Sequence, residues 1–303
     1  MHNPENKIKV AILGVGNCAS SLVQGVEYYT RNNEQKSGLM TDNIGGYRAK
    51  NIEFVCGFEI DDRKIGQTLK DAIFAKPNCT IVLNDDISTQ APIYRSPVLD
   101  GVSPLMEAYP EANRFVIKDE LKTTDLLKDA VSYDKDLVYA LRNEIVSQLR
   151  EHEVEVLINY LPVGSQLATE FYAEICIELG ISLVNCIPVF ITSDPVWEQK
   201  FINAGIPIIG DDMRSQFGAS IVSQMLQELA FERGHHVKAH IQRNVGGNTD
   251  FLNMEDKNRL KSKKISKENV IRAQNDIRGI STENSFLHAG PSEYIPFYGD
   301  NKV

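Results

Sequence analysis

Along most of this chain, short runs of apolar residues alternate with longer segments in which apolar residues recur at helical spacing. Residues 8–13 (IKVAIL) and 52–58 (IEFVCGF) are short and mostly apolar, as expected of strands that are buried on both faces. Between them, Leu22, Val26 and Tyr29 recur at helical spacing, which places them on one face of a helix. A strand, a helix and a second strand in this order predict a parallel β–α–β unit.

The same alternation continues in the middle of the chain. Val138, Leu141, Ile145 and Leu149 mark one face of an amphipathic helix. The apolar run at 154–160 then predicts the next strand, which completes a further β–α–β step.

A helix is expected at 166–179. Ser165 is placed to cap its first turn, and Gly180 is placed to end it. A strand at 181–186 follows, and Pro195 lies near the start of the next helix. This order of elements predicts an α/β fold of the doubly wound, dinucleotide-binding type.

Two regions interrupt the pattern. The segment 30–50 contains pairs such as Asn32-Asn33 and Gly45-Gly46 and is expected to form an inserted loop. Between 71 and 105 we expect loops and short strands, because prolines break any longer element. These prolines are Pro77, Pro92, Pro97 and Pro104.

A helix near 221–229 has apolar residues on one face and ends at Gly234. We interpret it as the hinge between two domains, since 303 residues suit about two domains of ~150 residues each. The predicted boundaries are 1–234 for the dinucleotide-binding domain and 235–303 for a smaller second domain.

The first predicted strand runs directly into Gly14-Val15-Gly16-Asn17-Cys18-Ala19, a G-x-G-x-x-A motif. Gly14 permits a tight turn, and Gly16 lets the backbone approach a diphosphate. Ala19 lets the following helix pack close to the strand, so that a diphosphate can lie on the N–H groups of the helix start. We therefore assign the turn, including Asn17 and Cys18, to cofactor binding.

An acidic residue at the end of the second strand would accept hydrogen bonds from the adenosine ribose, and Glu59 takes this place. A carboxylate there favours NAD over NADP, whose 2′-phosphate it would repel. The separation from Gly14 is more than twice the usual one of about 20 residues, because of the inserted loop. Asp61 and Asp62, in the next turn, are alternatives for the same role.

Charge and composition limit the classes of partner. The net charge of −9 and the isoelectric point near 5.3 argue against binding to nucleic acid or to an anionic membrane, because both require a basic face. No apolar run has the length of a membrane span, and the N-terminus lacks the apolar core of a signal peptide. We therefore expect a cytoplasmic protein.

Cysteines and histidines do not predict a metal site. The five cysteines include no C-x-x-C pair, and we interpret them as mostly buried small side chains. His235, His236 and His240 form a weak metal-binding pattern, but a strand that carries polar side chains is the better interpretation.

Two further turns carry candidate chemistry. The turn at 161–165 should face the ligand crevice at the carboxyl ends of the strands, which makes Pro162, Gly164 and Ser165 candidates for cofactor contact. In the segment 210–216, the adjacent acids Asp211 and Asp212 could hold a cation or perturb each other's pKa, and a capped, solvated turn is the alternative. Asp211 and Ser215 complete the predicted cofactor set.

Near the end of the chain, the run 244–254 (NVGGNTDFLNM) places Asn248 and Asp250 on a polar turn. Lys263 and Lys267 follow in the run 262–267 (SKKISK), four residues apart, and share one face if the segment is helical. Two ammonium groups so close repel each other unless an anion lies between them, so the pair could bind an anionic group. A solvated basic surface is the alternative.

These motifs together resemble the inositol-phosphate synthases in their shorter bacterial and archaeal form. The resemblance is carried, in order, by the glycine-rich turn with its helix (GVGNCASSLVQGVEYY), NYLPVGS, PVFITSDPVW, GDDMRSQ, NVGGNTDFLNM and SKKISK. It implies a Rossmann domain with a second α+β domain that supplies most of the active site and the tetramer interface, and hence a homotetramer.

The resemblance also implies a reaction in inositol and phospholipid biosynthesis, the NAD-dependent conversion of glucose 6-phosphate to 1L-myo-inositol 1-phosphate. Carbon 5 is oxidised, carbon 6 becomes acidic, an aldol step closes the ring onto carbon 1, and the ketone is reduced again. An activating cation of unknown identity is a further expectation. The residues that match the family's catalytic and phosphate-binding groups are Lys263, Lys267, Lys302, Asp212, Asp250 and Asn248.

Two departures from the family remain. Arg214 stands where relatives carry lysine, a change that keeps the charge but alters the geometry. The family's chain continues beyond the point that corresponds to Val303, and residues 292–303 read as a turn followed by a strand that has barely started, so an incomplete second domain is expected.

Three functions are therefore weighed. The first is the synthase. The second is an NAD-dependent dehydrogenase with net hydride transfer, which the lysine cluster without a His/Asp pair disfavours. The third is a catalytically impaired, NAD-binding relative.

Overall fold

The computed structural model describes residues 7–32, 34, 37–118, 135–213, 218–256 and 286–299. Its strands are β1 (Ile8–Leu13), β2 (Ile52–Glu59), β3 (Ile93–Arg95), β4 (Val156–Asn159), β5 (Ser182–Asn185), β6 (Ile208–Ile209), β7 (Ala239–Gly246) and β8 (Phe286–Tyr294). Its α-helices are α1 (Asn17–Arg31), α2 (Leu69–Ala72), α3 (Lys135–Glu151), α4 (Gln166–Leu179), α5 (Pro195–Ala204), α6 (Ala219–Glu232) and α7 (Thr249–Asn253). Short 3₁₀ turns lie at Ala49–Asn51, Pro104–Ala108, Glu111–Asn113 and Pro296–Tyr298.

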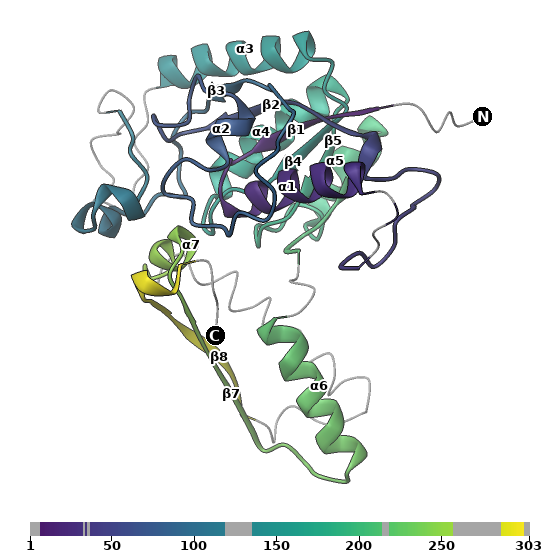
Figure 1. Ribbon diagram of the computed structural model, residues 1–303, viewed down its shortest axis with the longest axis vertical. Coiled ribbons are helices and arrows are strands. Elements are labelled where there is room, and N and C mark those ends of the chain that lie inside the picture. Colours follow the sequence, from purple (N-terminus) through teal and green to yellow (C-terminus); the bar gives the residue numbers. More distant parts are fainter. Residues whose placement is uncertain are drawn as a thin grey trace.

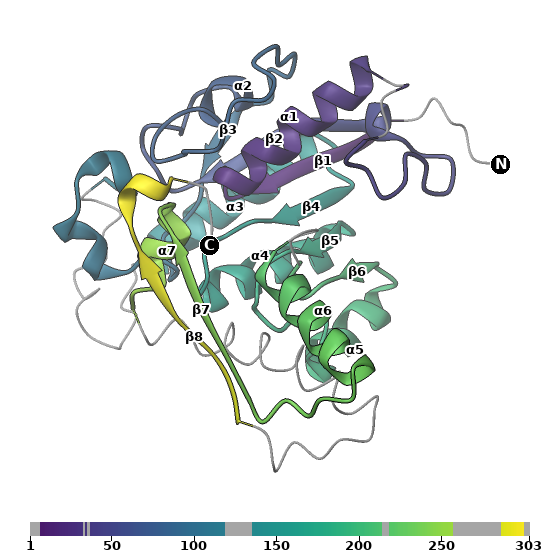
Figure 2. The same ribbon diagram turned by 60° about the horizontal axis from the view of Figure 1, so that its bottom comes forward.

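The first six strands form one parallel sheet in the order β3-β2-β1-β4-β5-β6. This is the strand order of the Rossmann fold. Successive strands are added on one side of β1 as far as β3 and then on the other side from β4 to β6, so the switch point lies between β1 and β4. Figures 1 and 2 show helices on both faces of this sheet. The predicted doubly wound α/β fold is therefore confirmed.

Strand alternation divides the apolar side chains between two cores. Ala11, Leu13 and Phe58 point to the face covered by α3, α4 and α5. Val10 and Ile12 point to the opposite face, where they pack against α1 and α2. Burial on both faces explains why the strands read as continuous apolar runs.

A second unit contains the parallel pair β7–β8, helix α6 and helix α7. Figure 1 shows the β7–β8 pair extending away from the six-stranded sheet, with α7 at the nearer end. Helix α6 contacts β7, where the Ser223 hydroxyl donates to Oε1 of Gln242 at 2.9 Å. The domain boundary at residue 234 stays a prediction, and in the structure α6, which precedes residue 234, packs against β7 of the second unit.

Most element predictions hold. The helix predicted at 166–179 has these bounds, and Gly180 ends it with a left-handed φ of 75°. The segment 37–48 forms turns and one isolated bridge, as expected of an inserted loop. The strand interpretation is confirmed for His240, which lies in β7, whereas His235 and His236 precede that strand.

The prediction for residues 292–299 is wrong. Residues 292–294 end strand β8, and a 3₁₀ turn follows at Pro296–Tyr298. Gly290 and Pro291 lie where the β7–β8 register shifts, opposite the step from Gln242 to Asn244. Proline donates no ladder hydrogen bond and is tolerated at such a bulge, so β8 continues through it.

None of the described helices is long and apolar enough to cross a membrane.

Candidate functional site

The glycine-rich turn links β1 to α1 at the carboxyl end of the sheet. Gly14 has a left-handed φ of 83°, and a Cβ at this position would lie 2.9 Å from the carbonyl oxygen of Tyr160. Its N–H donates to the carbonyl oxygen of Phe58 at 3.0 Å. Only glycine fits here, because both the φ angle and the contact with the end of β4 exclude a side chain.

Gly16 has the opposite surroundings. Its φ is −91°, and no atom beyond its chain neighbours lies within 4 Å of an added Cβ. It is the N-cap of α1, and neither a side-chain cap nor an acidic residue occupies the first turn of that helix. A helix start without a side-chain cap, beside open space, fits an anionic group such as a diphosphate.

Asn17 uses its side chain within the protein. Its Oδ1 accepts hydrogen bonds from the N–H of Cys79 at 2.9 Å and from the N–H and hydroxyl of Thr80 at 3.2 and 2.9 Å. These bonds tie the segment after α2 to the start of α1. A contact between Asn17 and the cofactor stays a prediction, as do the cofactor roles of Cys18 and Ala19.

Glu59 is 6% exposed and holds the glycine-rich turn. One carboxylate oxygen accepts from the N–H of Val15 at 3.2 Å and lies 3.4 Å from Nζ of Lys64. The other accepts from the N–H groups of Ile60 at 2.7 Å and Asp61 at 3.1 Å. The predicted ribose contact stays a prediction, and these bonds give Glu59 a second task, which is to fix the turn.

Asp61 and Asp62, the alternatives to Glu59 for the ribose contact, also have partners within the protein. Asp61 is fully buried and forms two hydrogen bonds with the guanidinium of Arg63, at 2.8 and 2.6 Å, while it accepts from the N–H of Val116 at 3.2 Å. Asp62 lies 3.2 Å from Nζ of Lys118. Asp61 therefore serves the fold of this turn rather than offering an open carboxylate.

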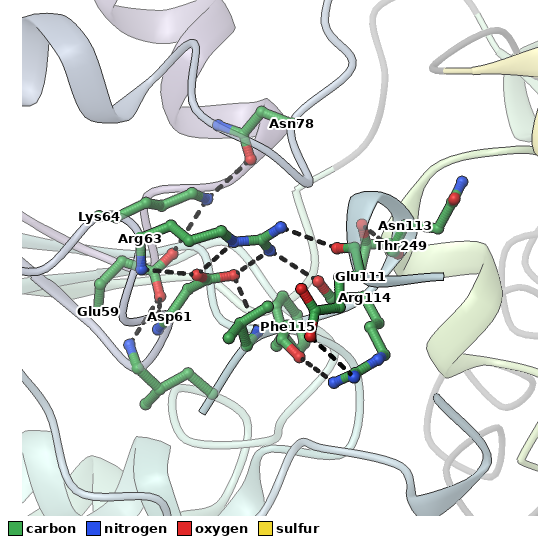
Figure 3. Close-up of polar contacts among 12 residues, drawn as sticks. Glu59, Asp61, Arg63, Lys64, Asn78, Glu111, Asn113, Arg114, Phe115 and Thr249 are labelled. Atoms are coloured by element: carbon green, nitrogen blue, oxygen red, sulfur yellow. Dashed lines mark hydrogen bonds and ion pairs between the residues drawn. The ribbon is translucent and has the colours of Figure 1, made fainter. Parts of the chain in front are cut away.

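Arg63 links this turn to the segment that touches the second unit. Its guanidinium donates to the carbonyl oxygens of Glu111 and Arg114, both at 2.8 Å. Figure 3 shows these contacts reaching Asn113, whose carbonyl accepts from the Thr249 hydroxyl at 3.4 Å. The segment 111–114, which contains the 3₁₀ turn Glu111–Asn113, thus connects the turn after β2 to the start of α7.

The turn between β4 and α4 is built differently from the prediction. Ser165 makes no side-chain cap to α4, because its hydroxyl donates to the carbonyl oxygen of Pro162 at 2.7 Å. Asp100 caps the helix instead, accepting from the N–H of Leu167 at 2.7 Å and of Ala168 at 3.1 Å. The capping role of Ser165 was wrong, since a carboxylate distant in sequence satisfies the helix start more strongly.

The motif 244–254 docks α7 onto this β4–α4 turn. Asn248 caps α7 by accepting from the N–H of Phe251 at 3.1 Å. At the other end, the fully buried Asn253 donates to the carbonyl oxygen of Val163 at 2.9 Å and accepts from the N–H of Ser103 at 3.1 Å. The polar turn of the second unit therefore lies beside the carboxyl end of β4.

Glycine lets this turn pack closely. A Cβ on Gly247 would lie 2.4 Å from the carbonyl oxygen of Ile295, and its N–H donates to the carbonyl oxygen of Gly299 at 3.0 Å. Asp250 lies in the first turn of α7. Its catalytic role, like that of Asn248, stays a prediction.

Asp211 fixes a loop. Its carboxylate accepts from the N–H groups of Ile191, Thr192 and Ser193 at 3.0 to 3.1 Å, and from Nδ2 of Asn185 at 2.7 Å. These four donors hold the loop 191–193 against Asp211, and a contact between Asp211 and the cofactor stays a prediction. Among the described residues, no group of three or more His, Cys, Asp or Glu side chains is arranged to hold a metal ion.

Asp212 has a left-handed φ of 62°, and its N–H donates to the carbonyl oxygen of Ile187 at 3.1 Å. A non-glycine residue in this region is strained, as residues at functional sites often are. The remaining predicted site residues lie outside the described part of the chain: Arg214, Ser215, Lys263, Lys267 and Lys302.

The cysteines are mostly buried, as predicted. Cys56, Cys176 and Cys186 are buried, Cys79 is half-buried and Cys18, in the first turn of α1, is exposed. Burial raises the pKa of Cys56 to about 12 and that of Cys186 to about 11, so both are neutral thiols near pH 7.

Sequence reasoning missed several residues that build the site. Lys64, Asn78 and Asp100 belong to no motif, because each acts on a distant segment through one side chain. Asn253 lay inside a quoted motif, but nothing in the pattern singled it out.

Comparisons with known proteins agree on one family. The family model described as myo-inositol-1-phosphate synthase matches residues 218–303. An inositol-3-phosphate synthase of Mycobacterium tuberculosis is 43% identical over 298 residues, which cover 98% of this chain and 74% of the relative. The inositol-3-phosphate synthase of Mycolicibacterium smegmatis is 41% identical over 307 residues, covering 100% and 77%.

Solved structures support the fold. The crystal structure of a myo-inositol-1-phosphate synthase-related protein from Thermotoga maritima has a TM-score of 0.70 and 24% identity, over 98% of this chain and 76% of that one.

Proposed function

The chain belongs to the inositol-3-phosphate synthase family, and from this we propose that it converts glucose 6-phosphate to 1L-myo-inositol 1-phosphate with NAD as cofactor. The observation that carries the proposal is the convergence of three motifs. The glycine-rich turn, the β4–α4 turn and the docked α7 meet where Gly14 approaches Tyr160 and Asn253 binds Val163. In open α/β sheets, ligands bind at this edge.

The residues present suit NAD. Gly16 leaves open space at the start of α1, which lacks a side-chain cap, and this supports a diphosphate held by backbone N–H groups. Gly14, Gly16, Asn17, Cys18 and Ala19 would line that part of the site, with Glu59 towards the ribose. Bound NAD supplies the oxidation of carbon 5 and the final reduction of the ketone. We further propose the β4–α4 turn, Asp211 and Ser215 as the remaining cofactor contacts.

The chain's own groups carry the steps between oxidation and reduction. Enolisation at carbon 6 and ring closure onto carbon 1 both build negative charge on oxygen, which ammonium groups stabilise. We assign this task, and the binding of the phosphate, to Lys263, Lys267 and Lys302. Asp212, Asp250 and Asn248 are proposed to move protons and to orient the sugar hydroxyls.

One assay tests this function against its competitors. The purified chain is incubated with glucose 6-phosphate and NAD, and inositol phosphate and free NADH are both quantified. The synthase forms inositol phosphate without net NADH. NADH that accumulates with turnover would instead establish a dehydrogenase, and NAD binding without any product would establish a catalytically impaired relative.

We also propose a homotetramer, supported by the exposed apolar face of α6. Met225 and Leu226 are 63% and 61% exposed, and Leu229 is 54% exposed, whereas Ser223 and Gln227 on the other face are buried and Ser223 hydrogen-bonds to Gln242 of β7. A helix whose apolar side faces outward suits contact with another subunit. Sedimentation should give the mass of a tetramer, and a monomer at micromolar concentration would overturn this proposal.

A further inference from the structure

Lys64 is a charged side chain in an unusual place. It follows β2, in the turn that starts at Asp61, and is 1% exposed. Lysine is almost never fully buried unless it is paired, because its ammonium loses the solvation of water. No predicted cofactor or catalytic role involves Lys64, so its burial needs another explanation.

The ammonium of Lys64 has three hydrogen-bond partners. Nζ donates to the carbonyl oxygen of Val15 at 2.8 Å and to Oδ1 of Asn78 at 2.9 Å, and it lies 3.4 Å from Oε1 of Glu59. Figure 3 shows Lys64 between Glu59 and Asn78. An ammonium has three N–H donors, so these contacts account for all of them, and Glu59 balances the charge.

All three side chains converge on Val15, the residue between the two glycines of the turn. Asn78 also donates from Nδ2 to the Val15 carbonyl oxygen at 3.1 Å, and Glu59 accepts from the Val15 N–H at 3.2 Å. Both polar backbone groups of Val15 are therefore held from behind the turn.

This clamp sets the direction of the next N–H group. The peptide bond from Val15 to Gly16 is trans, so the carbonyl of Val15 and the N–H of Gly16 point in opposite directions. Because the Val15 carbonyl is held toward buried Lys64, the Gly16 N–H is directed away from Lys64. A Cβ built on Gly16 would meet no atom within 4 Å, so this side of the turn has open space.

We infer that Lys64 is a positioning residue for the cofactor: by holding the Val15 carbonyl, it aims the Gly16 N–H at the diphosphate of the dinucleotide. This inference rests on the proposed NAD-dependent function. Lys64 contacts the turn and not the cofactor, so it acts on cofactor affinity and not on the reacting atoms.

The test compares Lys64→Met with two controls. Lys76→Met removes an exposed lysine nearby in the chain, and Leu149→Ala destabilises the core on the other face of the sheet. Calorimetry should show NAD affinity at least about tenfold weaker in Lys64→Met, with turnover at saturating NAD within about twofold of the unaltered chain. Leu149→Ala should lower the unfolding temperature but leave NAD affinity unchanged.

A second background covers the case in which Lys64→Met leaves Glu59 unpaired and does not fold. Lys64→Met is added to Glu59→Gln, which removes the buried charge, and NAD affinity is compared with Glu59→Gln alone. A further loss of about tenfold supports the hold on Val15. A change below about twofold would show that Lys64 only neutralises Glu59, and would overturn the inference. If the unaltered chain does not bind NAD, the proposed function fails first, and the inference fails with it.

Discussion

Asn253 and Val163, 90 positions apart in the chain, are joined by a hydrogen bond of 2.9 Å from the side-chain amide to the backbone carbonyl. Asn253 belongs to α7 of the second unit, and Val163 to the turn after β4. Around this bond, Phe251, Leu252 and Val163 share one buried apolar cluster. The relative position of the polar turn and the glycine-rich turn is therefore set by a buried contact rather than by chain connectivity.

Replacement of Asn253 by alanine should lower the free energy of unfolding. The change leaves the Val163 carbonyl and the Ser103 N–H buried without their partner, which costs about 1–3 kcal/mol in the free energy of unfolding. Denaturant unfolding measures the loss, with the exposed Asn203→Ala in α5 as the matched control. Equal stability of both variants would mean that the contact does not hold the two units together.

Gly16 and Gly14 should respond differently to substitution. Gly16→Val places a side chain in open space at an ordinary φ, so the protein should fold as before but lose NAD binding, because the diphosphate no longer reaches the helix start. Gly14→Ala should instead lower the unfolding temperature, since its φ is 83° and its Cβ would meet Tyr160. Unchanged NAD affinity in Gly16→Val would refute the cofactor turn.

Glu59→Ala tests the two tasks of this carboxylate. We expect weaker NAD binding, because the Val15 N–H loses its acceptor, and a smaller preference for NAD over NADP, because the 2′-phosphate is no longer repelled. Dissociation constants for both dinucleotides measure the effect. A preference that stays the same while NAD affinity falls would leave Glu59 with the turn alone and assign the ribose contact elsewhere.

The lysine pair is tested by kinetics. Lys263→Ala should reduce turnover by roughly two or more orders of magnitude, the scale of losing a proton-transfer or charge-stabilising group, while NAD binding survives. Lys267→Ala should also weaken the binding of glucose 6-phosphate, because the sequence predicts a second cation four residues from Lys263 that can pair with the phosphate. Lys264→Ala is the neighbouring control. If all three variants behave alike, the run is a solvated basic surface.

The sequence was sufficient for elements that depend on local signals. The apolar runs predicted the parallel strands, because a strand buried on both faces has no polar alternation. Gly180 and Pro195 marked the end of α4 and the start of α5, since each acts on the backbone next to it.

Long-range side-chain contacts could not be predicted in the same way. Asp100 replaced Ser165 as the cap of α4, and nothing near Asp100 indicates a helix that starts 66 residues later. Lys64 and Asn78 contact Val15 across 49 and 63 positions of the chain, and no local pattern indicates such contacts. Strand β8 was missed because it is defined by its pairing with β7, a distant segment of the chain, and not by a local pattern.

The central claim is that this chain oxidises and re-reduces the same carbon of glucose 6-phosphate within one catalytic cycle. The most direct measurement supplies glucose 6-phosphate deuterated at carbon 5, together with NAD, and follows the label by mass spectrometry. The account predicts inositol phosphate that retains the deuterium, with no labelled NADH accumulating in solution. Deuterium that collects in free NADH, or NAD binding without any inositol phosphate, would contradict it.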